Sequence, residues 1–322
     1  MGGPVVPAPA IVPPGSRGAR PDGAIRLGSE EHLRLLCLEL LETHDPYKPS
    51  VIDWPALDED TRGRITSLPI WDIAVQTEGR AGLNVKTFGE RCCTGLLQEA
   101  VMMNAFEESR HKQVLANMVE FYGITLQPEP QYPVPGDAEW AFMVTGYSEC
   151  IDSFFGFGLF DLAKSSGFFP NELVETFEPV MREEGRHILF FVNWVAWWRR
   201  NMPWWRRPWF ELKVFAVWVF LIWERIGTAR AVESHGNAAD NNFTVSGSQQ
   251  LGVDITFSQL AAICLKENDR RLAPYDVRLI RPVFVPAMTR LALRLAGARR
   301  RALRKHKRDD QRPTGIKANG HF

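Results

Sequence analysis

The chain has 322 residues, of which 45% are apolar, and a formal net charge of zero. This is enough for one large domain or two small ones with a substantial core, which excludes disorder throughout. The zero net charge gives no sign of nucleic-acid binding. The five cysteines are scattered and form no CxxC pair, which argues against a thiolate metal site. This cysteine pattern fits a reducing compartment, and the cytoplasm is the default expectation.

The N-terminal residues 1–28 are rich in Pro, Gly and Ala and are predicted to form a disordered arm. Prolines interrupt its apolar part, so neither a signal peptide nor a membrane span is expected there. A satellite helix is predicted from Ser29 to about Thr43. His32 and His44, near its two ends, are expected on the surface.

The first helix of a bundle is predicted to begin at about Pro69 and to carry Glu78. Two signals for its end disagree. The sequence Thr87-Phe-Gly-Glu90 matches a capping box and would begin the next helix there. The midpoint between Glu78 and Glu108, however, is Cys93, which favours a later turn.

The position of the turn between these two helices decides which carboxylate reaches the site. With a turn near Asn84, Glu78 would lie about 24 Å along the bundle from Glu108. Glu59 or Glu90 could then replace Glu78 as a metal ligand.

The second helix is predicted to end at Tyr122-Gly123. Four prolines make residues 123–137 non-helical, and at about 3.3 Å per residue they can cover about 50 Å. This length permits a long crossover that makes the second and third helices parallel.

The third helix is predicted from an N-cap at Asp137 to Gly167. The fourth is predicted to begin near Pro170, to bend at Pro179 and to end at about Asn201. The third helix contains three glycines that favour either close packing or a pocket: Gly146, Gly156 and Gly158.

A run rich in Trp and Arg follows between Trp194 and Trp223, and its last ten residues are all apolar. One interpretation is a fifth helix buried against the bundle. The other is an amphipathic surface that rests on a membrane interface. Residues 234–254, including His235, are predicted to be loop, and helices are expected at 256–272 and 283–308.

The residues that carry chemistry lie in two nearly identical sequences, Glu107-Glu108-Ser109-Arg110-His111 and Glu183-Glu184-Gly185-Arg186-His187. On a helix, the second Glu and the His of each sequence lie on one face, one turn apart. Two such faces can bind two metal ions when two further helices each add a carboxylate. Glu78 and Glu149 precede the second Glu of the two motifs by 30 and 35 residues, as expected for helical hairpins. The predicted metal ligands are Glu78, Glu108, His111, Glu149, Glu184 and His187.

One copy of the motif would be typical of a solvated helix face with an Arg salt bridge. Two copies among apolar residues indicate burial, and buried carboxylates without a cation would cost several kcal/mol each. Mixed carboxylate and imidazole ligands suit Fe(II) or Mn(II) better than zinc.

Over about residues 69–201 the sequence resembles the ferritin-like non-haem di-iron carboxylate superfamily. EESRH and EEGRH are similar to the E/D-E-x-R-H signatures of acyl-carrier-protein desaturases and of the hydroxylase subunits of bacterial multicomponent monooxygenases. The resemblance implies an all-α fold, a ferritin-like four-helix bundle with a long crossover, to which the N- and C-terminal helices are added.

Residue by residue, the resemblance implies that the six predicted ligands hold two Fe ions. The acid that precedes each ligand Glu would hydrogen-bond the His of the opposite helix, Glu107 with His187 and Glu183 with His111. Arg110 and Arg186 would balance the negative charge of the site. The sequence lacks the additional His before Glu184 found in the arylamine N-oxygenases of this superfamily, which counts against that subgroup.

The resemblance also implies a function, in which O2 is the co-substrate. It predicts an oxygenase or oxidase that hydroxylates, desaturates or N-oxidises a small apolar organic substrate, with extra helices to build the substrate cavity. Ferritin-like iron oxidation is the main alternative, and a structural metal site is another. A ribonucleotide reductase small subunit is disfavoured because Leu115 stands where the resemblance requires Tyr.

No Rossmann fingerprint, Fe–S cysteine set or flavin motif is present, so a separate reductase or ferredoxin is expected to donate electrons. The predicted organisation is an arm (1–28), a di-iron domain (29–298) and a basic flexible tail (299–322). The basic tail and the Trp-rich run are the predicted sites of any peripheral membrane contact of an otherwise cytoplasmic protein.

Overall fold

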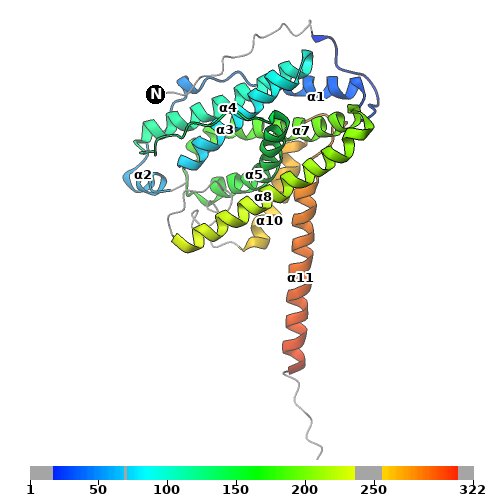
Figure 1. Cartoon of the computed structure of the whole chain (residues 1–322). Coiled ribbons are helices and arrows are strands. Elements are labelled where there is room, and N and C mark those ends of the chain that lie inside the picture. Colours follow the sequence, from blue (N-terminus) through cyan, green and yellow to red (C-terminus); the bar gives the residue numbers. More distant parts are fainter. Residues whose placement is uncertain (1–16, 69–70, 236–255, 311–322) are drawn as a thin grey trace, which may run out of the picture. The chain divides into compact units, whose positions relative to one another are not determined.

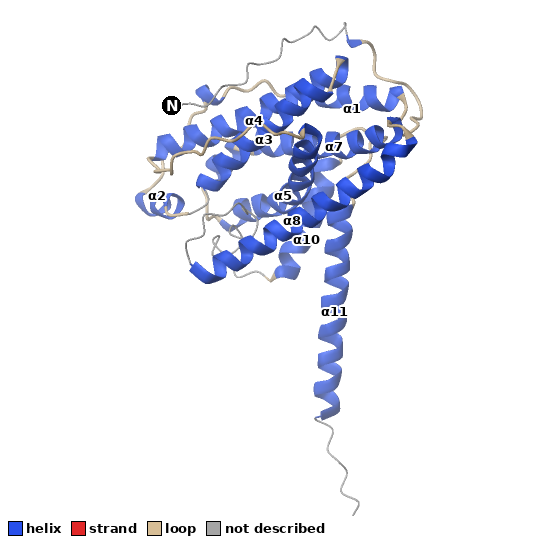
Figure 2. Cartoon of the chain, viewed as in Figure 1, coloured by secondary structure: helices blue, strands red, loops and turns tan. Residues whose placement is uncertain are grey.

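The computed structural model describes residues 17–68, 71–235 and 256–310, and within these ranges all regular secondary structure is helical (Figures 1 and 2). The all-α prediction is therefore confirmed. The chain divides after Pro282 into two compact units. The helices of the first unit are α1 (Glu30–Glu42), α2 (Glu59–Thr66), α3 (Trp71–Cys92), α4 (Gly95–Tyr122), α5 (Ala138–Ser166), α6 (Asn171–Thr176), α7 (Glu178–Asn201), α8 (Arg207–His235) and α10 (Phe257–Leu272).

Parts of several predictions fall outside the described residues. These are most of the N-terminal arm, the predicted helix start at Pro69, the loop at 236–254 and the end of the basic tail. The predicted domain boundaries at residues 28 and 298 stay predictions. Helix α8 continues to His235, two residues into the predicted loop.

Helix α3 runs without a break to Cys92, and α4 begins at Gly95 after a two-residue turn. The predicted capping box at Thr87 is wrong, because the Thr87 hydroxyl lies inside α3 and donates a 2.7 Å hydrogen bond to the carbonyl of Leu83. Packing explains why α3 continues past Thr87. Val85 and Phe88 continue the buried face of α3 past the local capping signal.

The ends of the following helices agree with the sequence. Gly123 and Gly167 adopt left-handed conformations (φ 70° and 68°) that end α4 and α5. Asp137 caps α5 by accepting a 2.8 Å hydrogen bond from the backbone N–H of Trp140. Pro179 stands in the first turn of α7, and the predicted bent fourth helix is two helices, α6 and α7, that meet at Phe177.

Side-chain contacts give the directions of the four long helices that surround the site. Helices α3 and α5 are antiparallel, since Phe88 stacks on Phe142 at 4.3 Å and Asn84 donates to Thr145 at 3.0 Å. Helices α3 and α4 form an antiparallel hairpin and lie side by side (Figure 1). Helices α4 and α5 are therefore parallel, and residues 123–137 form the crossover between them.

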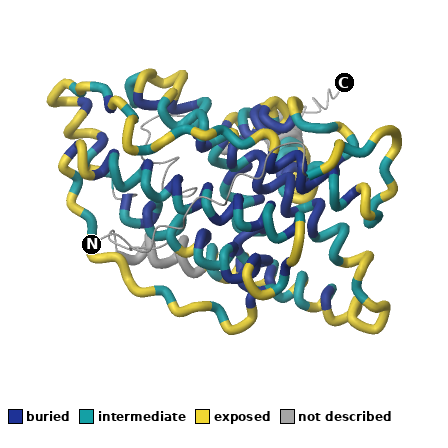
Figure 3. The backbone as a smooth tube through the Cα atoms, turned by 90° about the horizontal axis from the view of Figure 1, so that it is seen from above, coloured by how far each residue is buried: buried dark blue, intermediate teal, exposed yellow. Residues whose placement is uncertain are grey.

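The buried positions gather in the interior of the first unit (Figure 3). Helix α1 packs against α4 and α7, and its His32 is fully buried, with Nε2 2.9 Å from Oδ1 of Asn193. The surface placement predicted for His32 is wrong, because Asn193 on α7 supplies a partner that local sequence does not reveal.

Helix α8 resolves the two interpretations of the Trp-rich run only in part. Phe210, Val217 and Leu221 are buried, while Trp209 and Trp223 are 72% and 71% exposed. One face packs on the bundle and the other is apolar and open. Among the described residues, no helix is both long enough and apolar enough to cross a bilayer.

The second unit contains one described helix, α11 (Phe284–Asp310), close to the predicted range 283–308. Its exposed apolar residues recur at helical spacing, and they are Phe284, Met288, Leu291 and Leu295. Its last three turns are rich in Arg and Lys.

Candidate metal centre

The two motif histidines meet in the middle of the first unit. His111 on α4 and His187 on α7 are both fully buried, and their ring centroids lie 5.6 Å apart. Each histidine has a motif carboxylate from the opposite helix beside it. The predicted motif faces therefore turn toward each other.

Each imidazole is held through its outer nitrogen. Nε2 of His111 lies 2.8 Å from Oε2 of Glu183, and Nε2 of His187 lies 2.8 Å from Oε2 of Glu107. A carboxylate at this distance accepts the Nε2–H hydrogen bond and so fixes the tautomer that leaves Nδ1 with a lone pair. This is the pairing that the resemblance implies.

The inner nitrogens also face carboxylates, but without a hydrogen bond. Nδ1 of His187 lies 2.8 Å from Oε1 of Glu108, and Nδ1 of His111 lies 3.2 Å from Oε1 of Glu184. Yet both Nδ1 atoms and Oε1 of Glu108 are buried without a hydrogen bond in the described structure. Buried polar atoms are normally satisfied, so this group of converging lone pairs requires an explanation.

A metal ion supplies one. One ligand atom from each of Glu108, His111, Glu184 and His187 lies within 4.8 Å of the others. Two nitrogen and two oxygen donors at this spacing fit a borderline cation such as Fe(II) or Mn(II).

Two further carboxylates face this group from α3 and α5. Oε2 of Glu78 lies 3.6 Å from Nδ1 of His111, and Oε1 of Glu149 is buried without a hydrogen-bonding partner in the described structure. Burial raises the pKa of Glu78 to about 8. Burial, together with repulsion from Glu108 and Glu184, raises the pKa of Glu149 well above its usual value.

The continuous α3 brings Glu78 to the site because the turn lies at Cys93. The alternatives considered for this ligand lie elsewhere: the Glu90 side chain is 55% exposed and pairs with Lys86, and Glu59 is exposed on α2. Among the described residues, Glu78 is thus the α3 carboxylate that faces His111.

Two buried arginines bind the carboxylates that hold the histidines. Nη2 of Arg186 lies 2.6 Å from Oε1 of Glu107, and Arg110 forms an ion pair with Glu183. Attraction to Arg186 and hydrogen bonds from the histidines outweigh burial and hold the pKa of Glu107 well below its usual range. When all six carboxylates of the site are ionised, they exceed the two guanidinium groups by four negative charges, which two divalent cations would neutralise.

The excess of carboxylates also raises the pKa values of the two histidines in the metal-free protein. Burial alone would lower the pKa of His111, but the hydrogen bond with Glu183 and the neighbouring carboxylates raise it well above its usual value. The same causes raise the pKa of His187, with Glu108 the largest of them. In the metal-free site, protons can thus occupy the Nδ1 positions that a metal would take.

His44 is a residue of the site that the sequence did not reveal. Its Nδ1 lies 2.5 Å from Oε1 of Glu107, and its side chain is only 14% exposed. The predicted surface location is wrong, because the segment after α1 folds back over α4. No periodicity or motif marks this contact in the sequence.

Comparisons of the chain with protein-family models, with curated proteins and with solved structures found no match. The chemical interpretation of the site therefore rests on its own residues and their geometry.

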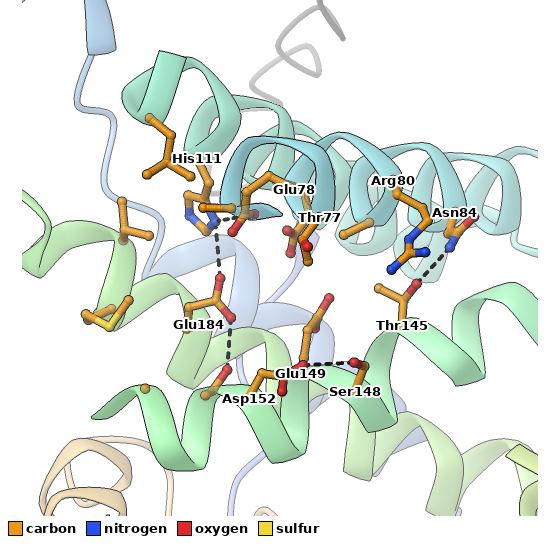
Figure 4. A pocket seen from close by; sticks show the side chains of 18 of the residues that line it. Thr77, Glu78, Arg80, Asn84, His111, Thr145, Ser148, Glu149, Asp152 and Glu184 are labelled. Carbon is orange, nitrogen blue, oxygen red and sulfur yellow. Dashed lines mark hydrogen bonds and ion pairs between the residues drawn. The ribbon is translucent and has the colours of Figure 1, made fainter. Parts of the chain in front are cut away.

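A cavity of about 600 Å³ adjoins the centre. Glu78, His111, Glu149 and Glu184 point into it from four different helices (Figure 4). Most of the remaining lining is apolar and comes from α3, α4, α5, α6, α7, α8 and the crossover. Its size and character are typical of a site for a small organic molecule.

Proposed function

We propose that this protein is a non-haem di-iron oxygenase or oxidase that acts on an apolar organic substrate. The observation that carries the proposal is the pair of buried imidazoles whose Nδ1 atoms face carboxylates without a hydrogen bond, next to an apolar cavity that His111 lines. Helices α3, α4, α5 and α7, with the crossover between parallel α4 and α5, support the ferritin-like bundle that the motif resemblance implies.

The proposed ligands divide into two sets that mirror each other. His111, Glu184 and Glu78 would hold one Fe ion, and His187, Glu108 and Glu149 would share in holding the other. Two iron ions, when bound, would supply the two-electron reduction of O2 and an oxidant for a strong C–H or N–H bond. Since no redox motif is present in the sequence, a separate reductase or ferredoxin would supply electrons.

The protein's own residues prepare this chemistry. Glu107 and Glu183 accept the Nε2–H hydrogen bonds of the histidines and prevent their rings from turning. Arg110 and Arg186 form ion pairs with those two carboxylates and hold them in place. Reorganisation during a reaction would therefore be small.

The cavity would select and orient the substrate. Its apolar walls exclude water, while one side offers hydroxyl and amide groups. Thr145 accepts a 3.0 Å hydrogen bond from Asn84, and Ser148 donates a 2.9 Å hydrogen bond to Asp152 (Figure 4). A mainly apolar substrate with one polar group fits this lining best.

The cavity also weighs against the other candidate functions. Iron oxidation and storage needs no organic pocket of this size next to the metal. Leu115, which stands in the place of a radical-forming Tyr, lines the cavity as an apolar wall. Both facts favour an organic substrate.

The test is to load the metal-free protein with Fe(II) without oxygen, count the bound iron, and then admit O2. The proposal predicts two irons per chain and the absorption of an oxo-bridged ferric pair. Glu184→Ala should bind fewer irons and lose that absorption, while Glu90→Ala, on the exposed side of α3, should change neither. Retention of two bridged irons in Glu184→Ala would refute the ligand set, and large multimers with many irons per chain would favour storage.

A further inference from the structure

Helix α8 and the turn before it present an unusually apolar outer face. Its large exposed side chains, here called the α8 face, are Trp204, Trp205, Trp209, Leu212, Phe215, Val219, Phe220, Ile222, Trp223 and Ile226. Trp204 is 76% exposed and Phe215 is 64% exposed. Exposed aromatic surface of this extent on a folded unit marks an interaction site.

Two charged residues of α8, Lys213 and Arg225, are turned toward α5 and away from this face. Lys213 pairs with Asp137 and Glu139 at 2.9 Å, and Arg225 pairs with Asp152 at 2.9 Å, all of which lie at or within α5. The face from Trp209 to Trp223 is left uncharged over about 21 Å of helix.

Cations collect at one end of the face. Arg206 and Arg207 are exposed beside Trp205, and Arg200 is exposed at the end of α7. Within the described residues, none of these three arginines has a carboxylate at ion-pair distance, and Arg200 and Arg207 bond only to backbone carbonyls. The nearest acid on α8, Glu211, is already paired with Arg199.

We propose that the α8 face is a docking surface for the interface of a bilayer that contains anionic lipid. Trp side chains with an apolar body and a polar N–H suit the headgroup level, and unpaired arginines suit lipid phosphates. Anionic lipid supplies negatively charged partners for these arginines, which have no carboxylate partner among the described residues. A second copy of the chain would bring the same cations and no surplus acid.

The position of the face relative to the cavity agrees with this occupant. Phe220 lines both the 600 Å³ cavity and a shallow hollow on the α8 face, which Leu212, Val219 and Trp223 also line. One side chain thus separates the proposed lipid contact from the proposed substrate site. The docking proposal itself does not depend on iron or on any catalytic activity.

The experiment is co-sedimentation of the full chain with vesicles of phosphatidylcholine, with and without phosphatidylserine. We expect binding to the vesicles that contain phosphatidylserine, a blue shift of tryptophan emission on binding, and weakening at high salt. The variant Trp205→Ser/Trp209→Ser/Trp223→Ser should weaken vesicle binding by about tenfold or more, because it removes three exposed apolar anchors.

The matched control carries three serine substitutions at exposed apolar positions away from the face: Val51→Ser, Phe121→Ser and Val277→Ser. It should bind vesicles like the original protein. Both variants should keep the original unfolding midpoint and iron content, which separates a docking defect from misfolding. Arg206→Gln/Arg207→Gln should weaken binding mainly at low salt, and Lys266→Gln, an exposed lysine on α10, should not.

Two results would overturn the proposal. One is equal vesicle binding by the triple Trp variant and the original chain, which would assign any binding to other parts, such as the basic α11. The other is a stable dimer in sedimentation equilibrium that does not bind vesicles and that the Trp variant converts to monomers. That result would assign the face to a second copy of the chain.

Discussion

Glu107 and Glu183 do more than add charge. Each fixes one imidazole through Nε2, so that Nδ1 faces the carboxylates from α3, α4, α5 and α7. Each also forms an ion pair with a buried arginine, Glu107 with Arg186 and Glu183 with Arg110. Replacement by Ala would remove the closest carboxylate partner of a buried arginine and would cost about 3 kcal/mol of stability or more. A milder change is therefore needed to isolate the effect on metal binding.

Glu183→Gln is that change, since the amide oxygen can still accept from His111 but no longer balances Arg110 or strengthens the imidazole as a ligand. We expect the folded structure to persist and the affinity for one of two Fe(II) ions to fall about 10- to 100-fold. Titration of metal-free protein with Fe(II) would measure both binding steps. Glu90→Gln is the control, and unchanged affinity in Glu183→Gln would contradict the assigned role.

The ionisation of Glu78 predicts a pH dependence. Its pKa is raised from 4.5 to about 8 in the folded, metal-free protein, so the folded state holds this proton more tightly than the unfolded state does. The free energy of unfolding should then fall as pH rises from about 4.5 to about 8, and the raised pKa values of Glu149, His111 and His187 act in the same direction.

Iron must displace these protons, so Fe(II) affinity should rise over the same pH range. Denaturant unfolding of the metal-free protein and Fe(II) titration, both at several pH values, would measure the two trends. In Glu78→Gln, which has no proton to lose at this position, both dependences should be weaker. A metal-free protein that gains stability between these pH values would contradict the account.

At the scale of helices, the glycines of α5 serve two different purposes. A Cβ at Gly146 would overlap the ring of Phe191 on α7, whereas a Cβ at Gly156, which lines the cavity, would meet nothing within 4 Å. From the sequence, these glycines favour either close packing or pocket space. The structure assigns one to each glycine.

Gly146→Ala should therefore destabilise the protein by about 1–3 kcal/mol, because Phe191 has to move. Gly156→Ala should stabilise it by about 0.5–1 kcal/mol, because Ala is the better helix former and has room. Denaturant unfolding of the two variants beside the original protein measures the difference. Equal effects would show that α5 and α7 are not packed as described.

The helices illustrate what sequence can predict. Caps such as Asp137, and glycines such as Gly123 and Gly167, act locally, and the helix ends they mark were predicted correctly. Thr87 carried an equally good local signal and was misleading, because the buried face of α3 continues through Phe88. Local capping is worth about 1 kcal/mol, less than the packing of one large buried side chain.

In the site, too, local sequence predicts some features and tertiary packing determines the others. The spacing of Glu and His in each motif predicts which side chains share a helix face. The contacts of His44 and His32 depend on how α1 and the segment after it lie against α4 and α7, and nothing within a few residues of either histidine encodes that. The absence of hydrogen bonds at the inner nitrogens likewise appears only in three dimensions.

At the scale of the first unit, the proposed iron centre, the apolar cavity and the α8 face follow one another across the bundle. Phe220 and Leu221 of α8 line the cavity, and His111 of α4 and Glu184 of α7 also line it. This order suits a substrate that partitions into lipid. The order itself is a property of the fold, whereas the metal and the lipid remain proposals.

The most direct measurement is anomalous X-ray scattering at the iron edge from crystals of the Fe(II)-loaded protein. The account predicts two iron peaks, one beside Nδ1 of His111 and one beside Nδ1 of His187, with Glu78 and Glu149 as further ligands. A single peak, peaks on the Nε2 side near His44, or an empty centre in iron-loaded crystals would contradict it.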